Sequence, residues 1–291
     1  MQILKHSIRQ CRWHEGVIAM KMTQFYHKNR VFLGIVEENG FRPIDFDGDM
    51  VDFIRCGKPP VTREKTIPFD TVKWAAPVTR PSKIIALGLN YKDHAKESKG
   101  KIPDVPLIFA KFPNSLIGHN EPIRWDASLT KKVDFEAELA VIIGKEAHNC
   151  LESEAMKAVF GYTCANDVSA RDLQFGDGQW VRGKSLDTFC PLGPWIVTAD
   201  ALPDPHSLII RSWLNGSLMQ DSHTNLMFFR IPWLVSFLSR HFTLIPGDVI
   251  LTGTPAGVGA FRDPSVYMKD GDEVVVEVEK IGRLVNTCRT R

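Results

Sequence analysis

Short apolar runs separated by turn residues follow one another along most of this chain. Residues 272–279 show the clearest pattern, because valines alternate with glutamates there, as expected for a strand with one buried face. Asn215-Gly216 lies between two further apolar runs, and Asn-Gly is the dipeptide that favours a two-residue hairpin turn. A polar turn directly after the apolar run 31–36 predicts another hairpin near the N-terminus.

One amphipathic helix is predicted over residues 232–242. Leu234, Val235, Phe237 and Leu238 gather on one side of it at helical spacing. Few other helical segments alternate with the strands, so a doubly wound parallel sheet is not expected. The pattern therefore predicts a β-rich α+β fold with short peripheral helices.

Three parts are predicted along the chain. Residues 1–19 carry basic residues before the first acidic one, which fits a weak mitochondrial targeting segment or, as we favour, an extension upstream of a natural start at Met20. Residues 20–78 predict a small N-terminal domain. Residues 79–291 then form a large domain, which holds all of the candidate chemistry described below.

Composition narrows the class of protein without identifying it. Hydrophobic residues make up 44% of the chain and charged residues 24%, with a net charge of +2. The basic residues are scattered among acidic ones, which argues against a nucleic-acid partner, and no apolar run approaches the length of a membrane span. The six cysteines form no C-x-x-C pair, so we expect no zinc site and reduced thiols in a cytoplasmic protein, with the mitochondrial matrix as the alternative location.

Three acidic residues form a candidate metal site. Glu136 and Glu138 lie two apart in a run typical of a strand, so both project from one face, and Asp167 ends a second strand-like run. Carboxylates this close repel one another unless they share a cation, and oxygen ligands suit a hard cation such as Mg²⁺, Mn²⁺ or Ca²⁺. The alternative is a solvated strand face. Arg171 and Asp172 follow closely, and we expect an ion pair there to hold Asp167 in place.

A second candidate group consists of His94 and Glu97. They lie three apart after a buried strand, and on a helical turn that spacing places both side chains on one face. The Glu97 carboxylate would then orient the imidazole and raise its basicity. Alone, each is more often a solvated surface residue. The polar segment 97–103 predicts a lid that orders over a substrate.

Taken together, five segments resemble the fumarylacetoacetate hydrolase family over roughly residues 80 to 291. The five segments are 83–97, 134–144, 166–174, 183–188 and 246–259. The resemblance is closest to the short-form branch, which includes the bacterial 2-hydroxyhepta-2,4-diene-1,7-dioate isomerase-like enzymes. It implies the mixed β-roll of the family's C-terminal domain, and a homodimer.

The same resemblance implies a role for particular residues. It makes Glu136, Glu138 and Asp167 the ligands of Mg²⁺ or Mn²⁺, and it makes His94 and Glu97 the base dyad. Lys184 corresponds to the family's active-site lysine, which neutralises an enolate or a substrate carboxylate. Gln174 and Thr254 correspond to residues that position the substrate.

The predicted function is that of a divalent-metal-dependent enzyme acting on small 2-oxo acids or their enols through a metal-stabilised enolate. An isomerase or tautomerase and an acylpyruvate C–C hydrolase are the leading forms. Oxaloacetate decarboxylase and ureidoglycolate lyase remain alternatives, because they would use the same residues. A non-catalytic binding protein that retains the fold would show a broken ligand set, whereas all expected positions are filled. A serine hydrolase is not expected, because the chain has no G-x-S-x-G motif.

Overall fold

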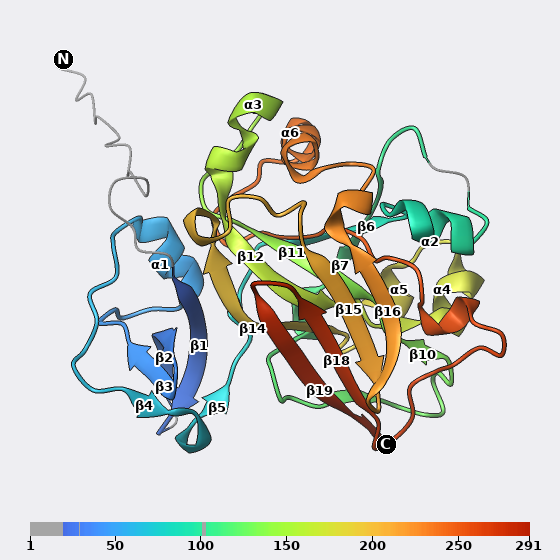
Figure 1. Cartoon of the computed structure of the whole chain (residues 1–291), viewed down its shortest axis with the longest axis horizontal. Coiled ribbons are helices and arrows are strands. Elements are labelled where there is room, and N and C mark those ends of the chain that lie inside the picture. The colour runs from blue at the N-terminus through green and yellow to red at the C-terminus, as the bar shows by residue number, and fades with distance from the viewer. Residues whose placement is uncertain (1–19, 29, 101–102) are drawn as a thin grey trace, which may run out of the picture.

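The computed structural model describes residues 20–28, 30–100 and 103–291 (Figure 1). The predicted segment 1–19 and residues 101 and 102 of the predicted lid lie outside the described residues. The helices are α1 (Met50–Cys56), α2 (Lys92–Glu97), α3 (Glu152–Ala155), α4 (Arg171–Asp177), α5 (Val181–Lys184) and α6 (Ile231–His241). Short 3-10 turns are η1 (Phe69–Thr71), η2 (Pro113–Ser115), η3 (Met156–Ala158), η4 (Ala199–Ala201), η5 (Thr224–Leu226) and η6 (Gly259–Phe261).

Strands make up most of the regular structure. They are β1 (Lys21–His27), β2 (Arg30–Glu37), β3 (Gly40–Pro43), β4 (Ile67–Pro68), β5 (Lys73–Trp74), β6 (Ile84–Gly88), β7 (Leu107–Lys111), β8 (Leu116–Ile117), β9 (Ile123–Trp125), β10 (Val133–Asp134), β11 (Ala137–Ile143), β12 (Val159–Asn166), β13 (Ser169–Ala170), β14 (Cys190–Thr198), β15 (Ile209–Leu214), β16 (Ser217–His223), β17 (Val249–Leu251), β18 (Glu273–Val278) and β19 (Gly282–Thr290). The predicted β-rich fold with few helices is confirmed.

A large mixed sheet of twelve strands crosses the molecule. Its main path runs in the order β4-β3-β2-β1-β14-β12-β11-β17-β6-β7. The strands of the N-terminal region, blue at the left of Figure 1, join this sheet through the pairing of β1 with β14. Met22 and Leu33 from this region share one core cluster with Ile84 and Ile142 from the rest of the chain. The division predicted near residue 78 stays a prediction.

A second sheet of five strands has the order β16-β15-β18-β19-β9. It contains the hairpin β15–β16 predicted from Asn215-Gly216, and the predicted strand over 272–279 is present as β18, paired with β19. Asn215 and Gly216 have φ values of 49° and 77°, the left-handed conformations that a two-residue turn of this kind requires.

The main core lies between the two sheets and under α6. Leu139 and Tyr162 from the large sheet pack in it with Val276 from the small sheet and Val235 from α6. The predicted helix over 232–242 is thus confirmed as α6, which begins with Pro at its first turn, where a proline costs no hydrogen bond. Among the described residues, no helix is long and apolar enough to cross a membrane.

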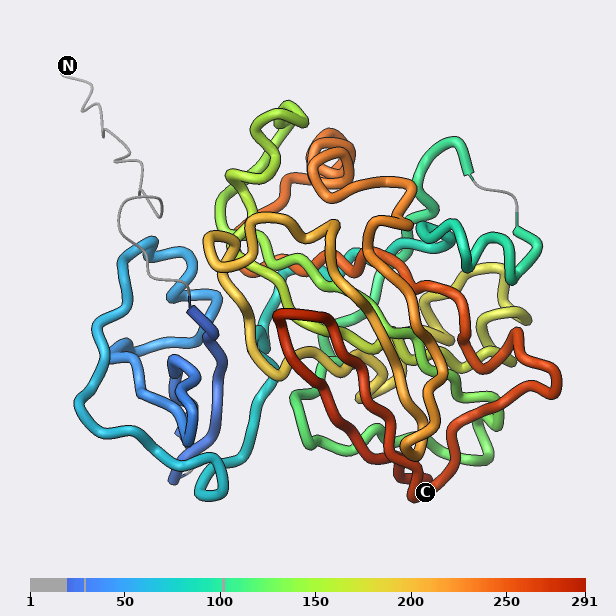
Figure 2. The backbone as a smooth tube through the Cα atoms, in the orientation of Figure 1, coloured from blue at the N-terminus to red at the C-terminus, as the bar shows by residue number. Residues whose placement is uncertain are grey.

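Four strand ends lie together at one edge of the large sheet, and the candidate site is located there. β11 runs antiparallel to β12 and β17, and β17 runs parallel to β6, so the C-terminal ends of β6, β12 and β17 lie beside the start of β11. The chain leaves these ends into α2, α4 and the loop after β17, which follow one another along one side of the molecule in the tube view (Figure 2).

Candidate active site and metal centre

The three predicted metal ligands converge at this edge of the sheet. Glu138 lies on β11, Glu136 directly precedes β11, and Asp167 directly follows β12. The pairing of Ala137 with Asn166 places Glu136 beside Asp167, whose amide donates a 2.9 Å hydrogen bond to the Glu136 carbonyl. One oxygen from each carboxylate lies within 4.8 Å of the others, and all three residues are buried.

Buried cations compensate part of this negative charge. The Lys184 ammonium lies 2.8 Å from Glu136 and 2.7 Å from Asp167. A second ammonium, that of Lys111, lies 2.6 Å from the other oxygen of Asp167. The Arg171 guanidinium lies 2.7 Å from Glu136. Burial alone would raise the pKa of Glu136, but Lys184 and Arg171 outweigh that effect and hold the pKa at about 2.

The ion pair expected from Arg171 and Asp172, which was to hold Asp167 in place, is not present among the described residues. Arg171 pairs with Asp134 and Glu136, and Asp172 accepts hydrogen bonds from Thr130 and the Lys131 amide. Asp167 is held by two lysines instead. The prediction was wrong because the two neighbours at the start of α4 point in different directions. Arg171 points toward the candidate site, whereas Asp172 points toward the loop before β10.

Glu138 is the carboxylate that the protein leaves least compensated. One of its oxygens accepts a 2.7 Å hydrogen bond from the Gly253 amide, whereas the buried Oε1 has no hydrogen-bond partner among the described residues. Burial, together with the Asp167 and Glu136 charges, raises the pKa of Glu138 well above its usual range. A divalent cation among the three carboxylates would satisfy the free oxygen and offset the repulsion, so these residues fit a hard cation.

His94 and Glu97 lie together on α2, as predicted. The Nδ1 atom of His94 is 3.2 Å from a Glu97 oxygen, and the other Glu97 oxygen accepts a 2.9 Å hydrogen bond from the Gly257 amide. Gly257 has a φ of 103°, and an added Cβ would lie 2.2 Å from the Met219 carbonyl oxygen, so a side chain cannot be accommodated there. The glycine-rich loop thus fixes the carboxylate that orients the imidazole.

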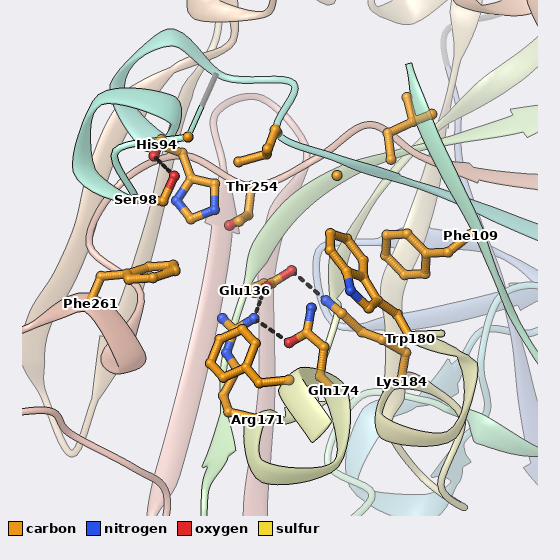
Figure 3. Close-up of a pocket in the computed structure, with 15 residues that line it drawn as sticks. His94, Ser98, Phe109, Glu136, Arg171, Gln174, Trp180, Lys184, Thr254 and Phe261 are labelled. Carbon is orange, nitrogen blue, oxygen red and sulfur yellow. Dashed lines mark hydrogen bonds and ion pairs between the residues drawn. The ribbon is translucent and has the colours of Figure 1, made fainter. Parts of the chain in front are cut away.

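A pocket of about 220 Å³ connects the two groups (Figure 3). His94, Glu136 and Lys184 line it together with Gln174 and Thr254. In Figure 3, Glu136 lies at the centre of the view, between Lys184 and the carboxamide of Gln174 on one side and Arg171 on the other. The pocket therefore brings a candidate proton-transfer group, a candidate metal ligand and an ammonium to one small space.

The two predicted substrate-positioning residues differ in their free hydrogen-bonding capacity. The Gln174 carbonyl accepts from Arg171 at 2.9 Å, which leaves its amide group as a donor for a bound molecule. The Thr254 hydroxyl already donates to the Ala137 carbonyl and accepts from Gln220.

Two aromatic side chains, Phe109 and Trp180, line the pocket beside Lys184. The rings of Phe109 and Trp180 meet edge to face with centroids 5.3 Å apart, and the Lys184 ammonium lies 5.0 Å from the Phe109 centroid. Such an aromatic lining excludes water and strengthens the electrostatic interactions in the pocket. Phe261 packs near the imidazole of His94 on the other side.

Three supporting residues were missed by sequence reasoning. Asp134 is fully buried and accepts hydrogen bonds from Arg171 and from the Gly259 and Ala260 amides. The sequence could have indicated Asp134, because it continues the two-residue spacing of Glu136 and Glu138. Gln220 and Lys111 are also fully buried and bind groups at the site, and no local sequence pattern marks either one.

Comparisons with known proteins agree with the geometry. The family model described as fumarylacetoacetate (FAA) hydrolase C-terminal matches residues 83–289. The chain is 44% identical over 263 residues to the bovine (Bos taurus) protein named oxaloacetate tautomerase FAHD2B, mitochondrial, covering 87% of this chain and 83% of the relative. It is 46% identical over 236 residues to the Dictyostelium discoideum fumarylacetoacetate hydrolase domain-containing protein 2 homolog, covering 77% of each chain.

Solved structures give the same assignment. The fumarylacetoacetate hydrolase from psychrophilic Exiguobacterium antarcticum superimposes with a TM-score of 0.83 at 38% identity, covering 94% of this chain and 100% of that chain. The 2-hydroxyhepta-2,4-diene-1,7-dioate isomerase from Mycobacterium marinum gives a TM-score of 0.80 at 35% identity, covering 94% of this chain and 99% of that chain. The predicted family and its short-form branch are confirmed. This chain belongs to the fumarylacetoacetate hydrolase family.

Proposed function

We propose that this protein is a divalent-metal-dependent tautomerase of small 2-oxo acids, with oxaloacetate as the leading substrate. The observation that carries the proposal is the meeting of two groups in one pocket. Three buried carboxylates converge within 4.8 Å, and His94, paired with Glu97, lines the same pocket as the ligand residue Glu136.

Glu136, Glu138 and Asp167 are the proposed ligands of Mg²⁺ or Mn²⁺. All three offer oxygen atoms, which these hard cations prefer, and Glu138 has a buried oxygen with no hydrogen-bond partner in the part of the chain that the structure describes. The cation would withdraw charge from the 2-oxo group and so favour loss or gain of a proton at the neighbouring carbon.

The remaining residues bind and orient an anionic substrate. Lys184 supplies a buried ammonium next to the carboxylates, where it stabilises negative charge on the substrate oxygen. The Gln174 amide donates a hydrogen bond to the substrate. Thr254 lines the pocket and contributes to its shape, since its hydroxyl already donates to the Ala137 carbonyl.

His94 moves the proton. In the enol-to-keto direction the C2 hydroxyl loses a proton and C3 gains one, so one base that also acts as an acid serves both positions. Glu97 holds the imidazole through Nδ1 and so leaves Nε2 for the substrate. No water is consumed and no carbon–carbon bond breaks. Relatives named as oxaloacetate tautomerases support this choice over the hydrolytic and decarboxylating alternatives.

The test follows freshly dissolved enol-oxaloacetate with Mg²⁺ or with EDTA, recording the ultraviolet absorbance of the enol together with pyruvate release. Loss of the enol that needs the metal and releases no pyruvate is the expected result. Pyruvate release in step with enol loss would establish a decarboxylase instead. Enol loss that is equal in EDTA would overturn the role of the metal.

Two properties of the protein in the cell belong to the same proposal. Several relatives have names that include the word mitochondrial, which favours the matrix location over the cytoplasmic one first expected. Fractionation of cells that express the full chain tests this location. A homodimer is the proposed assembly, and sedimentation equilibrium of the purified protein distinguishes it from a monomer.

A further inference from the structure

Lys111 is a buried lysine beside the metal centre that the proposed chemistry does not use. It is the last residue of β7, and its side chain is 0% exposed. Lysine is almost never fully buried unless it is paired, because a desolvated ammonium costs several kcal/mol. Its burial therefore calls for a specific partner.

All three donors of the Lys111 ammonium are engaged within the protein. The ammonium lies 2.6 Å from Asp167 Oδ1 and 3.3 Å from the Val168 carbonyl oxygen, and it also donates to the Lys184 carbonyl oxygen. An ammonium has three donors and no acceptor. Among the described residues that line the catalytic pocket, Lys184 is present and Lys111 is absent. Lys111 therefore has no donor left for a substrate.

These contacts join two functional residues that lie far apart in the sequence. One acceptor is the side chain of a proposed metal ligand, Asp167, which follows β12. Another acceptor is the main chain of Lys184, at the end of α5, whose own ammonium also meets Asp167. Lys111 thus fixes the rotation of the Asp167 carboxylate, whose second oxygen meets the Lys184 ammonium at 2.7 Å.

We propose that Lys111 is a positioning residue that orients Asp167 for metal binding and holds the Lys184 main chain beside it. This inference rests on the proposed metal centre. A simple charge effect would have the opposite sign, because removal of a nearby positive charge strengthens cation binding. Loss of orientation weakens it, typically about ten-fold to a hundred-fold when a partner of a metal ligand is removed. The sign of the change in affinity therefore decides between the two roles.

The experiment measures the Kd of Mn²⁺ for the full chain by the electron paramagnetic resonance signal of free Mn²⁺. Lys111→Met keeps the unbranched apolar stem of the side chain and removes the ammonium donors. We expect its Kd to rise about ten-fold or more. At saturating Mn²⁺ its kcat for oxaloacetate should still be reduced, because Lys184 has lost its main-chain anchor. Lys111→Gln keeps two donors and is expected to recover part of the affinity.

Lys83→Met is the matched control. Lys83 lies 2.5 Å from Asp248, whose side chain is 0% exposed, so this change also removes a lysine from a buried carboxylate, but one away from the metal ligands. Its Mn²⁺ affinity should stay within two-fold of wild type. If Lys111→Met does not fold, Lys111→Gln, which keeps Asp167 partnered, supplies the measurement.

Two outcomes contradict the inference in different ways. An unchanged or lower Kd in both Lys111 variants, with normal binding by the wild type, overturns the positioning role alone. A wild-type protein that binds no Mn²⁺ overturns the proposed metal centre itself, and the inference with it.

Discussion

The carboxylate cluster and the His94–Glu97 pair share one pocket but are built in different ways. The cluster lies at the ends of paired strands; the Glu136 and Asp167 side chains are 7% and 0% exposed, and Glu138 is fully buried. The His94–Glu97 pair lies on a six-residue helix, and the Glu97 side chain is 19% exposed. Strand pairing fixes the cluster through many backbone hydrogen bonds, whereas α2 is short and its Glu97 carboxylate is held by the Gly257 amide of a loop.

This difference suits the different tasks that we propose for the two regions. Metal ligands must be held close together against their own repulsion, which only a rigid, buried frame can do. A proton-transfer group must meet a substrate that enters and leaves, so it is better placed on an element that can shift. Changes in the cluster should therefore abolish metal binding and activity together, while changes near α2 should affect activity alone.

Glu138→Gln should have the largest effect. The amide keeps the shape of the side chain but is a poor ligand for a hard cation, and metal polarisation is worth several kcal/mol in such reactions. We expect turnover of enol-oxaloacetate to fall by about a thousand-fold or more, with loss of Mn²⁺ binding. Enzyme kinetics and a metal titration on the same preparation provide the measurement.

Glu146→Gln is the control, because Glu146 follows the same strand and is exposed. It should leave both properties unchanged. Metal-dependent turnover by Glu138→Gln at the wild-type rate would remove Glu138 from the ligand set.

His94→Asn should separate the two regions. General acid–base catalysis contributes about a hundred-fold to ten-thousand-fold, and that factor should be lost from kcat. Mn²⁺ affinity should stay at the wild-type value, because the proposed ligands lie on other elements. His148→Asn, at an exposed position, is the control. A variant that retains normal turnover would place the base elsewhere in the pocket.

The stability of the metal-free protein should depend on pH through Glu138. Its pKa is raised in the folded protein, so the folded state retains a proton that the unfolded chain releases above about pH 4.5. This contribution is fully present below that pH and is lost as pH rises toward the folded pKa.

Glu138→Gln removes this dependence. In EDTA, its Tm should exceed that of the wild type by a margin that grows between pH 5 and pH 8, roughly 2–4 °C for each 1 kcal/mol. With added Mg²⁺, the wild type should have the higher Tm of the two proteins, because only the wild type is stabilised by metal binding. Differential scanning calorimetry across this pH range measures both effects. If the Tm of the wild type and of Glu138→Gln differed by the same amount at every pH in EDTA, Glu138 would be charged in the metal-free protein.

The sequence reveals the main residues of both regions but not the contacts that support them, for a physical reason. Alternation along a strand is a local property, so the common face of Glu136 and Glu138 is visible in the chain, and so is the hairpin at Asn215-Gly216. The spacing of His94 and Glu97 likewise predicts their contact on a helical turn. These features need only the period of one element.

The supporting contacts depend on how separate elements pack, which no local period records. Lys111 lies 56 residues from Asp167 in the chain, and Gln220 lies 83 residues from the Ala137 amide that it accepts from. The partner of Arg171 likewise depends on packing and cannot be inferred from its position in the sequence. Its place near Asp167 in sequence suggested the wrong partner, because the strand pairing brings Asp134 and Glu136 closer to it.

Ser222→Ala should have the smallest effect and tests how α2 is held. The Ser222 hydroxyl donates a 2.5 Å hydrogen bond to Asp93, whose other oxygen accepts from the His94 amide at the start of α2. A hydrogen bond of this kind contributes about 0.5–1.5 kcal/mol, so its loss should lower kcat about two-fold to ten-fold by misplacing the imidazole.

Mn²⁺ affinity should not change in Ser222→Ala, because β16 does not carry a ligand. Ser217→Ala, at the exposed start of the same strand, is the matched control and should keep full activity. A parallel fall in metal affinity and turnover would mean that α2 and the carboxylate cluster move as one unit. In that case the contrast between a rigid cluster and a separately anchored proton-transfer element would not hold.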